Sequence, residues 1–440
     1  MLTFEEFISA SPSPYHSVKT AVDMLVSAGF KHIRESEVIP SNTPCVYTRD
    51  GTAVIGWIPG TDFTSGFTSV QSHTDSPCLR FVQSGAIKAF GTLMSIPVEP
   101  YSGLVVGRFI DRKLRVGGRI SYIVEKDGKF IPASILVKSE GEFVIPGLAP
   151  HMLRNPGDPK DWIPEGDDFV LCCPKTVTIN GKQIEVKEKA TMNDLFAPLL
   201  PVGAIISATQ IDISAIEFNR YGSLIQAPRI DNLASLYGSV VGLINSFKNI
   251  PTQASTRMIA GFNHEEIGSR TRSGAAGIGL HDWWLRVCQL PSDIAIAAMH
   301  KSLNISADGA HANHPAKGAS SCHDPIPVLG SGVCLKFGQK QNYAFTDNLS
   351  AVVIAIAKNA GVSTQKWVGK SFKAGGGTIG NLVAADCDMK VVDMGLPMLA
   401  MHSCLEMIDE ADLKGFEVFC ARVHEQGNAM LGLMLQLHHE

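Results

Sequence analysis

The 440-residue sequence has no long apolar run and no excess of basic residues. Its uninterrupted apolar stretches, such as "AVVIAIA" at 351–357, are far shorter than the roughly 18 to 20 residues that a membrane-spanning helix needs. Lysine and arginine number 38 against 42 acidic residues, a formal net charge of -4, so the basic surface typical of nucleic-acid and anionic-membrane binders is missing. We therefore predict a soluble protein with no nucleic-acid partner and no membrane partner.

The sequence also lacks a disulfide framework and a secretory signal. Its ten cysteines are scattered without a C-x-x-C pair, and Cys172 and Cys173 are adjacent. The first residues carry Glu5 and Glu6 where an export signal would carry positive charge. Both features favour a reducing environment, and we predict a cytoplasmic protein.

A chain of this length with 45% hydrophobic and 18% charged residues can bury a large core, and it exceeds the usual size of one domain. The segment from about 95 to 213 contains short β-type runs, "SGLVVGRFI", "KLRVGGRISYIV", "FIPASILV" and "TVTINGKQIEV", and the last carries an Asn180-Gly181 hairpin turn. This pattern predicts a β-rich domain.

Helical and strand patterns alternate on both sides of this segment. The first part contains a helical "SVKTAVDMLVSAGF" and the strands "TAVIGWI" and "FTSVQSH". The last part contains the helical "NLASLYGSVVGLINSF" and "NLSAVVIAIAKNA", the strands "RMIAGF", "DIAIAAM" and "KVVDM", and a final amphipathic helix. We predict an α/β domain formed by residues 1–94 and 214–440, with residues 95–213 inserted into it.

Acids and imidazoles follow several predicted strands of the α/β parts. Open α/β sheets bind ligands beyond the carboxyl ends of their strands, so these side chains are expected to meet at one edge. One further acid stands at the predicted start of a helix, in "APRIDN". The residues are His73, Asp75, Asp231, Glu265, Glu266, Asp308 and His402.

Two histidines and several carboxylates form a ligand set suited to two divalent ions, with one aspartate bridging them. In "NHEEIGS" the neighbouring Glu265 and Glu266 point apart, so one can bind a metal while the other transfers protons. In "HTD" the carboxylate of Asp75 can orient the His73 imidazole. Each feature has a simpler alternative, because paired acids occur in exposed loops, aspartates cap helices or turns, and buried histidines form ordinary hydrogen bonds.

Two familiar motifs are excluded. "HEEIG" lacks the second histidine of the H-E-x-x-H zinc helix. Residues 375–380, "GGGTIG", match G-x-G-x-x-G, but no clear strand is predicted before them, so a dinucleotide fingerprint is not expected.

The motifs "SHTDSPCLR", "APRIDN", "NHEEIGS", "SADGAHANHP", "GTIGN" and "LAMHSCLEM" resemble, in order and spacing, those of the aspartyl aminopeptidase family of dinuclear zinc peptidases. The resemblance extends from about residue 10 to 435. It implies a zinc-peptidase-like α/β/α catalytic domain with an inserted β-rich dimerisation domain. By this resemblance Asp231 bridges two metals, Glu266 and His402 bind one, His73 and Asp308 bind the other, Glu265 is the general base and Asp75 orients His73.

The same resemblance assigns three substrate-binding residues. Lys336 corresponds to a lysine that pairs with an acidic first side chain, and Tyr343 lies in the matching pocket segment. His151 corresponds to a histidine that a partner subunit donates to the neighbouring active site. The family's tetrahedral dodecamer, built from dimers, is then the expected assembly.

We therefore predict a cytoplasmic aminopeptidase that removes N-terminal residues, preferably Asp or Glu, from peptides with two divalent ions, Zn²⁺ or alternatively Co²⁺ or Mn²⁺. A broad or neutral-residue aminopeptidase, or a deacylase, would use the same metal site. A non-catalytic assembly protein of this fold is the third alternative, although all the candidate ligands and Glu265 are present.

Overall fold

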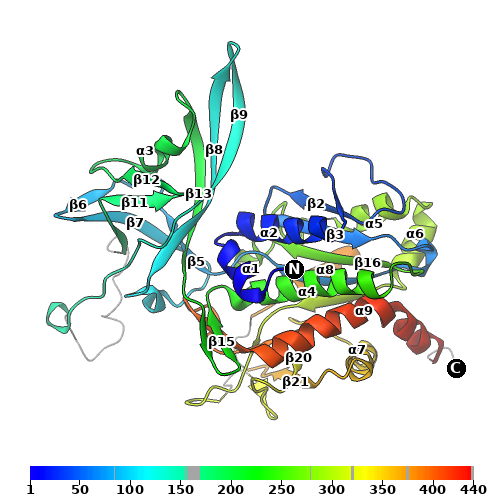
Figure 1. Ribbon diagram of the computed structural model, residues 1–440. Coiled ribbons are helices and arrows are strands. Elements are labelled where there is room, and N and C mark those ends of the chain that lie inside the picture. Colours follow the sequence, from blue (N-terminus) through cyan, green and yellow to red (C-terminus); the bar gives the residue numbers. More distant parts are fainter. Residues whose placement is uncertain are drawn as a thin grey trace.

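The computed structural model contains two sheets, one covered by helices and one that projects from the side of the first (Figure 1). It describes residues 1–83, 85–153, 155, 169–277, 279–318, 322–372 and 376–437. Within these residues, no helix combines the length and apolar character needed to cross a membrane.

The first sheet has ten strands, and its centre is parallel. Strands β16, β4, β17 and β22 are neighbours and run in the same direction, while antiparallel pairs flank them on both sides. The strand order is β1 (Lys31–His32), β2 (Cys45–Arg49), β3 (Ala53–Ile58), β16 (Thr256–Phe262), β4 (Phe67–His73), β17 (Leu303–Ala307), β22 (Lys390–Gly395), β20 (Val333–Phe337), β21 (Thr364–Gly369) and β19 (Cys322–His323).

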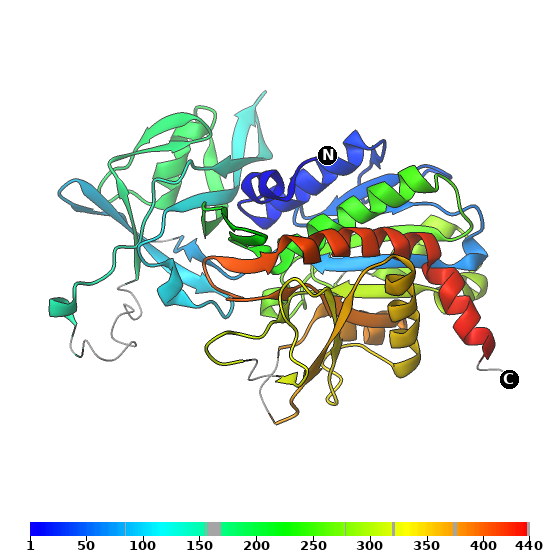
Figure 2. The same ribbon diagram turned by 60° about the horizontal axis from the view of Figure 1, so that its bottom comes forward.

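Helices cover both faces of this sheet. Successive residues of a strand point to opposite faces, so in β16 Ile259 joins one core while Met258 and Ala260 join the other. Figure 2 shows the long α9 running beside α4 over one face. That face also holds α1, α2 and α7, and the opposite face holds α5, α6 and α8. The bounds are α1 (Phe4–Ala10), α2 (Pro14–Ser27), α4 (Ile230–Asn249), α5 (Leu280–Cys288), α6 (Ser292–Met299), α7 (Asp347–Asn359), α8 (Ile379–Cys387) and α9 (Glu410–Leu437).

The second sheet is antiparallel and has its own apolar core. Its β8–β9 hairpin extends beyond the rest of the molecule (Figure 1). The strand order is β10 (Val170–Pro174), β7 (Leu93–Tyr101), β5 (Cys78–Phe81), β13 (Ile205–Ala215), β8 (Leu114–Lys126) and β9 (Lys129–Lys138), and β6 (Lys88–Phe90) pairs with β7.

Short elements complete the described fold. The hairpin of β11 (Thr176–Ile179) and β12 (Lys182–Glu185) turns at Asn180-Gly181, as predicted. One small sheet contains β14 (Asn219–Tyr221), β15 (Leu224–Ala227) and β24 (Glu406–Asp409), and another contains β18 (Ala310–His311) and β23 (Pro397–Met398). The remaining elements are the helix α3 (Met192–Phe196) and the 3₁₀ turns η1 (Phe63–Ser65), η2 (Val106–Phe109), η3 (Pro150–Met152), η6 (Ala197–Leu199) and η7 (Glu265–Ile267).

The predicted strand "DIAIAAM" is wrong, because these residues belong to helix α6. Continuous apolar runs do not separate helix from strand, and the alanines favour the helix. The strand that precedes Asp308 is β17, whose sequence "LNISA" places Asn304 and Ser306 in the buried interior. The Asn304 amide oxygen accepts a 2.6 Å hydrogen bond from the Ser69 hydroxyl of β4, which explains how a polar strand is buried.

Three further expectations need correction. "SGLVVGRFI" contains the 3₁₀ turn η2 where a strand was expected. Strand β21 does precede the glycine-rich segment, of which Gly375 lies outside the described residues. The boundary predicted between residues 94 and 95 falls inside β7, and β5 and β6 before it belong to the same second sheet. The division into two domains otherwise stays a prediction.

Candidate active site

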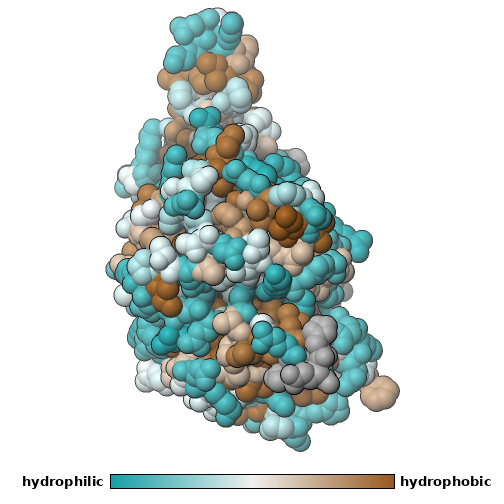
Figure 3. Space-filling model, turned by 90° about the vertical axis from the view of Figure 1, so that its right-hand side faces the viewer, coloured by the Kyte–Doolittle hydropathy of each residue, from teal (hydrophilic) through white to brown (hydrophobic). Residues whose placement is uncertain are grey.

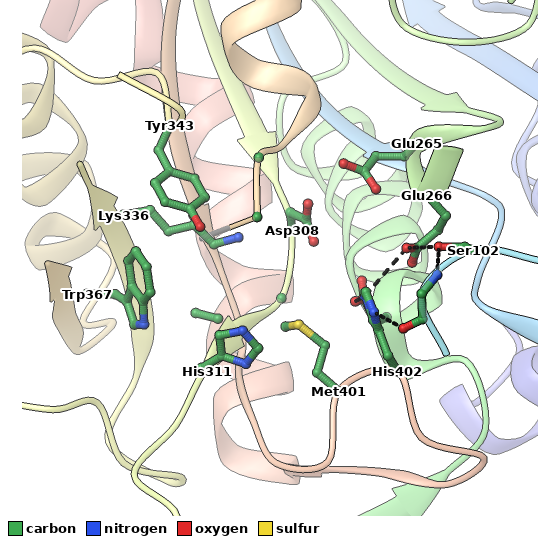
Figure 4. Close-up of a pocket in the computed structure, with 16 residues that line it drawn as sticks. Ser102, Glu265, Glu266, Asp308, His311, Lys336, Tyr343, Trp367, Met401 and His402 are labelled. Carbon is green, nitrogen blue, oxygen red and sulfur yellow. Dashed lines mark hydrogen bonds and ion pairs between the residues drawn. The ribbon is translucent and has the colours of Figure 1, made fainter. Parts of the chain in front are cut away.

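The predicted acids and imidazoles meet in a pocket at the carboxyl end of the parallel strands. His73 ends β4, Asp308 follows β17, and Glu265 lies three residues after β16. Ser102 and Gly103, which follow β7 of the second sheet, and the loop that carries His402 form another wall (Figure 4). The cavity has a volume of about 460 Å³.

Asp231 lies between the two imidazoles. Its Oδ1 is 3.4 Å from His73 Nε2, and its Oδ2 is 3.4 Å from His402 Nε2. The residue is 2% exposed and stands where α4 begins, with backbone angles that are not helical. Its two oxygens therefore face two separate positions.

One further carboxylate lies near each of these positions. Glu266 Oε2 is 3.4 Å from His402 Nε2, and Asp308 Oδ1 is 3.8 Å from His73 Nε2. Two ligands of one tetrahedral zinc ion, each about 2.1 Å from it, are roughly 3.4 Å apart. The spacing within each group therefore suits a divalent metal. Glu265 Oε2 lies 4.0 Å from His73 Nε2, at the edge of the second group.

Two carboxylate oxygens of the site also lack, within the described part of the chain, the partner that a buried charged atom requires. Asp231 Oδ1 and Glu266 Oε1 are buried and have no hydrogen-bond partner among the residues that the structure describes. Buried carboxylate oxygens are costly unless a hydrogen bond or a cation compensates them. Ligand atoms of His73, Asp231 and Glu266, and those of His73, Glu265 and Asp308, lie within 4.8 Å of one another. The residues present fit a centre of divalent ions.

Both imidazoles are oriented with Nε2 toward the acids. His73 Nδ1 lies 3.0 Å from the backbone carbonyl of Asp75, and His402 Nδ1 lies 3.1 Å from the carbonyl of Gly103. A carbonyl only accepts hydrogen bonds, so each Nδ1 donates its proton. A divalent ion that displaces the proton from Nε2 would then bind its lone pair.

Charge and burial shift the proton affinities in this site. Burial alone would lower the pKa of His402, but the hydrogen bond to Asp231 and the charge of Glu266 raise it to about 10. Burial raises the pKa of Glu265 to about 8, despite the opposing charge of His73. The Glu265 carboxyl can therefore hold or release a proton near neutral pH.

Asp75 is fully buried and holds the neighbouring segments in place. Its carboxylate accepts the backbone N–H groups of Glu265 and Glu266, at 3.1 and 3.2 Å, and the Tyr101 hydroxyl at 2.8 Å. Its carboxylate oxygen is 3.5 Å from His73 Nδ1, farther than its own carbonyl. Strand β4 ends at His73, so Asp75 lies in the following turn.

Lys336 and Tyr343 line the opposite side of the pocket (Figure 4). Lys336 is 5% exposed, and its ammonium lies 5.4 Å from the centre of the Tyr343 ring. Within the described residues, this ammonium makes no hydrogen bond and no ion pair. Burial would lower the pKa of Lys336, but the charges of Asp308 and other nearby acids raise it, so the lysine is a cation. His151 lies elsewhere, exposed in η3 and apart from the residues that line this cavity.

The sequence prediction missed several residues of this site. Glu406 is buried, and its two oxygens accept the backbone N–H groups of Asp231 and His402, both at 2.7 Å. It lies in the motif "LAMHSCLEM", which was the available signal. Ser102 donates a 3.2 Å hydrogen bond to Glu266. Its β-type surroundings gave no signal of chemistry.

The chain matches the model of the family described as "Aminopeptidase I zinc metalloprotease (M18)" over residues 7–420. It is 30% identical to aspartyl aminopeptidase 1 of Schizosaccharomyces pombe over 444 residues, which cover 94% of this chain and 92% of that protein. A chain in the solved structure of the Ape4 and Nbr1 complex superposes with a TM-score of 0.87 at 26% identity, covering 98% of this chain and 86% of that one.

A subunit of the mApe1 dodecamer from S. cerevisiae superposes with a TM-score of 0.82 at 21% identity, covering 98% of this chain and 97% of that one. These likenesses confirm the α/β fold with its second, β-rich part, and the family match confirms the predicted relationship. The fold, the histidine and carboxylate cluster and the match over nearly the whole length agree. The chain therefore belongs to the M18 family of zinc metalloproteases and is an aminopeptidase.

Proposed function

We propose that the protein is a dinuclear metal aminopeptidase that removes an N-terminal Asp or Glu from peptides. Asp231 would bridge the two ions, Glu266 and His402 would hold one, and His73 and Asp308 would hold the other. The distances of 3.4 Å from the two oxygens of Asp231 to the two imidazoles support this assignment. Zn²⁺ is the proposed ion, and Co²⁺ or Mn²⁺ also accept this ligand set.

The ions, when bound, would activate a water molecule and polarise the peptide carbonyl. Glu265 is the proposed general base. Its carboxylate takes a proton from the attacking water and returns it to the leaving amine nitrogen, so it ends the cycle unchanged. Asp75 keeps Glu265 in reach by accepting its backbone N–H, and it keeps His73 oriented through its carbonyl.

The preference for an acidic first residue rests on one observation, the buried Lys336 ammonium. A cation that is 5% exposed and unpaired within the described residues lies in the same cavity as the metal-site acids. The acids that stabilise this charge include the candidate metal ligands Asp308 and Asp231, and none of them forms a direct ion pair with the ammonium, so a substrate carboxylate can pair with it. Tyr343 packs beside the lysine and shapes this end of the pocket.

We further propose a homo-oligomeric, cytoplasmic enzyme, with the tetrahedral dodecamer built from dimers as the expected form. A subunit of the mApe1 dodecamer shares the fold. His151 is exposed and outside the pocket, as a residue donated to a partner subunit would be. The exposed apolar side chains of Leu148 and Met152 beside it are consistent with a subunit contact.

The experiment that tests the function is hydrolysis of aminoacyl chromogenic substrates carrying Asp, Glu, Leu, Ala or Lys. The protein is stripped with a chelator and reloaded with Zn²⁺, Mn²⁺ or Co²⁺. We expect metal-dependent cleavage led by Asp or Glu. A preference for Leu or Ala would reject the acidic pocket and keep the metal mechanism. No turnover by the folded, assembled and metal-loaded protein would favour the non-catalytic alternative.

A further inference from the structure

Residues 101–105 comprise Tyr101, the last residue of β7 in the second sheet, and the loop that follows it, and they contact the candidate metal ligands of the first sheet. Ser102 Oγ lies 3.2 Å from Glu266 Oε2 (Figure 4). The Tyr101 hydroxyl donates a 2.8 Å bond to Asp75. Gly103 and Val105 contact His402. The end of β7 and the loop that follows it therefore reach both sides of the site.

His402 is fixed by this segment at both its side chain and its backbone. The Nδ1 proton is donated to the Gly103 carbonyl at 3.1 Å, and the His402 carbonyl accepts the Val105 N–H at 2.9 Å. Because Nδ1 is occupied in this way, Nε2 points toward Asp231 and Glu266. Partners of this kind fix both the tautomer and the direction of a metal-binding histidine.

The Ser102 hydroxyl has a defined direction. Its oxygen accepts the backbone N–H of Gly103 at 2.6 Å, so its own proton is free to be donated to Glu266. Ser102 has φ of 69°, in the left-handed region that an L-residue other than glycine adopts at some cost. This conformation is compatible with both the hydroxyl and the Gly103 carbonyl facing the site.

Tyr101 is anchored within the second sheet. The Arg80 guanidinium of β5 lies 3.6 Å from the centre of the Tyr101 ring, and Arg80 Nε donates a 2.8 Å bond to Asp212 of β13. Three adjacent strands thus hold the tyrosine whose hydroxyl fixes Asp75. Asp75 in turn holds the backbone of Glu265 and Glu266.

We propose that the end of β7 and the loop that follows it, residues 101–105, are a structural part of the metal centre. They position the candidate ligands Glu266 and His402, and they fix Asp75, which supports His73 and Glu265. Ser102 and Tyr101 act as positioning residues. The inference rests on the proposed ligand assignment. Loss of such a supporting hydrogen bond typically weakens metal binding about 10- to 100-fold.

The first test is Ser102→Gly in the full-length protein. Glycine removes the hydroxyl but accepts the left-handed backbone, so the melting temperature of the metal-free protein is expected to stay close to that of wild type. Zinc is titrated against a chromophoric chelator. We expect one of the two zinc-binding steps to weaken about 10- to 100-fold. Ser207→Ala is the matched control, because its hydroxyl donates to the Ser121 carbonyl in the same sheet, away from the site.

The second test is Tyr101→Phe, which keeps the ring over Arg80 and removes only the bond to Asp75. We expect weaker zinc binding and a lower kcat with little change in KM, because Asp75 supports both His73 and Glu265. The matched control is Tyr122→Phe in β8, whose hydroxyl has no hydrogen bond among the described residues.

Three results would overturn the inference. If wild type binds two zinc ions and both variants bind them equally well, the ligand assignment stands and the role of the second sheet is rejected. If a variant binds zinc more weakly, but its metal-free form has also lost enough stability to explain that loss, Ser102 and Tyr101 support the fold alone. A wild-type protein that binds no zinc would instead overturn the ligand assignment, and this proposal with it.

Discussion

The two sheets of this protein differ in direction, burial and role. The central strands of the first sheet are parallel and buried along their whole length, as in β4 and β16. The second sheet is antiparallel, and β9 is exposed over most of its residues. Parallel strands end at one common edge, so the first sheet gathers acids and imidazoles there. The second sheet brings supporting hydrogen bonds to that edge and carries exposed apolar surface at its far end.

Figure 3 shows hydrophobic residues just below the hydrophilic tip of the projecting part of the molecule. The exposed apolar side chains of the β8–β9 hairpin include Phe130 and Ile131, at 60% and 42% exposure. A pair of exposed apolar residues on a long hairpin suits a protein contact better than catalysis. The first sheet therefore carries the candidate catalytic residues, and the second sheet carries residues that support them and an exposed apolar surface. The substitutions below test this division of roles.

The largest effect is expected for Glu265→Gln in the first region. The amide cannot accept the proton of the attacking water, so kcat should fall about 10²- to 10⁴-fold. Zinc content, measured by atomic emission, should stay at the wild-type level. Glu188→Gln, an exposed acid between β12 and α3, is the control and should leave kcat unchanged. If Glu265→Gln has the same kcat as wild type, Glu265 is not the general base.

Lys336→Met, at the same edge of the first sheet, is expected to change the preference for an Asp over a Leu substrate. Loss of the buried cation should lower kcat/KM for an Asp substrate about 30-fold, equivalent to about 2 kcal/mol, because the substrate carboxylate is then buried unpaired. kcat/KM for a Leu substrate should stay constant or rise. Lys366→Met on the neighbouring β21 is the matched control, since this lysine is exposed. A parallel loss for both substrates would contradict the proposed selectivity.

A pH effect on stability is expected from His424, which is buried in α9 against Thr68 of β4. Burial lowers its pKa to about 3, from about 6.5 in the unfolded chain. The folded protein therefore binds fewer protons, so this stability is present above pH 6.5 and is lost as pH falls toward 3. The loss at pH 5.5 is about 1.4 kcal/mol relative to neutral pH.

Denaturant unfolding of wild type and His424→Gln at pH 7.5 and 5.5 measures this effect. The variant should lose less stability between the two pH values by about 1.4 kcal/mol, because glutamine does not titrate. An identical pH dependence would show that another group is responsible. His281→Gln provides a control, since this histidine is only partly buried.

The smallest effect on stability is expected in the second region, at the hairpin end. Phe130→Ser should change the free energy of unfolding of the subunit by less than about 0.5 kcal/mol, because the side chain is already exposed. Light scattering after gel filtration reports the assembly. A smaller particle would assign this end to a subunit contact, and an unchanged particle would place the contacts elsewhere.

Local patterns in the sequence were enough to predict most strands of the first sheet and the polar residues that follow them. The apolar runs of β4 and β16 predicted strands, and the rule that ligands collect at strand ends indicated His73, Glu265 and Glu266 together. Helix α6 was mistaken for a strand because an alanine-rich apolar run satisfies both periods. The polar β17 was missed because Asn304 finds its partners on neighbouring strands.

Only the tertiary structure decided how the site is supported. Glu406 binds the backbone of Asp231, 175 residues earlier in the chain, and Ser102 binds Glu266, 164 residues later. Sequence patterns describe which residues are buried along one element, since burial follows the period of a helix or strand. The partner of a single hydroxyl or carboxylate depends on how distant elements pack, so the sequence could name the candidate ligands but not the hydrogen bonds that hold them.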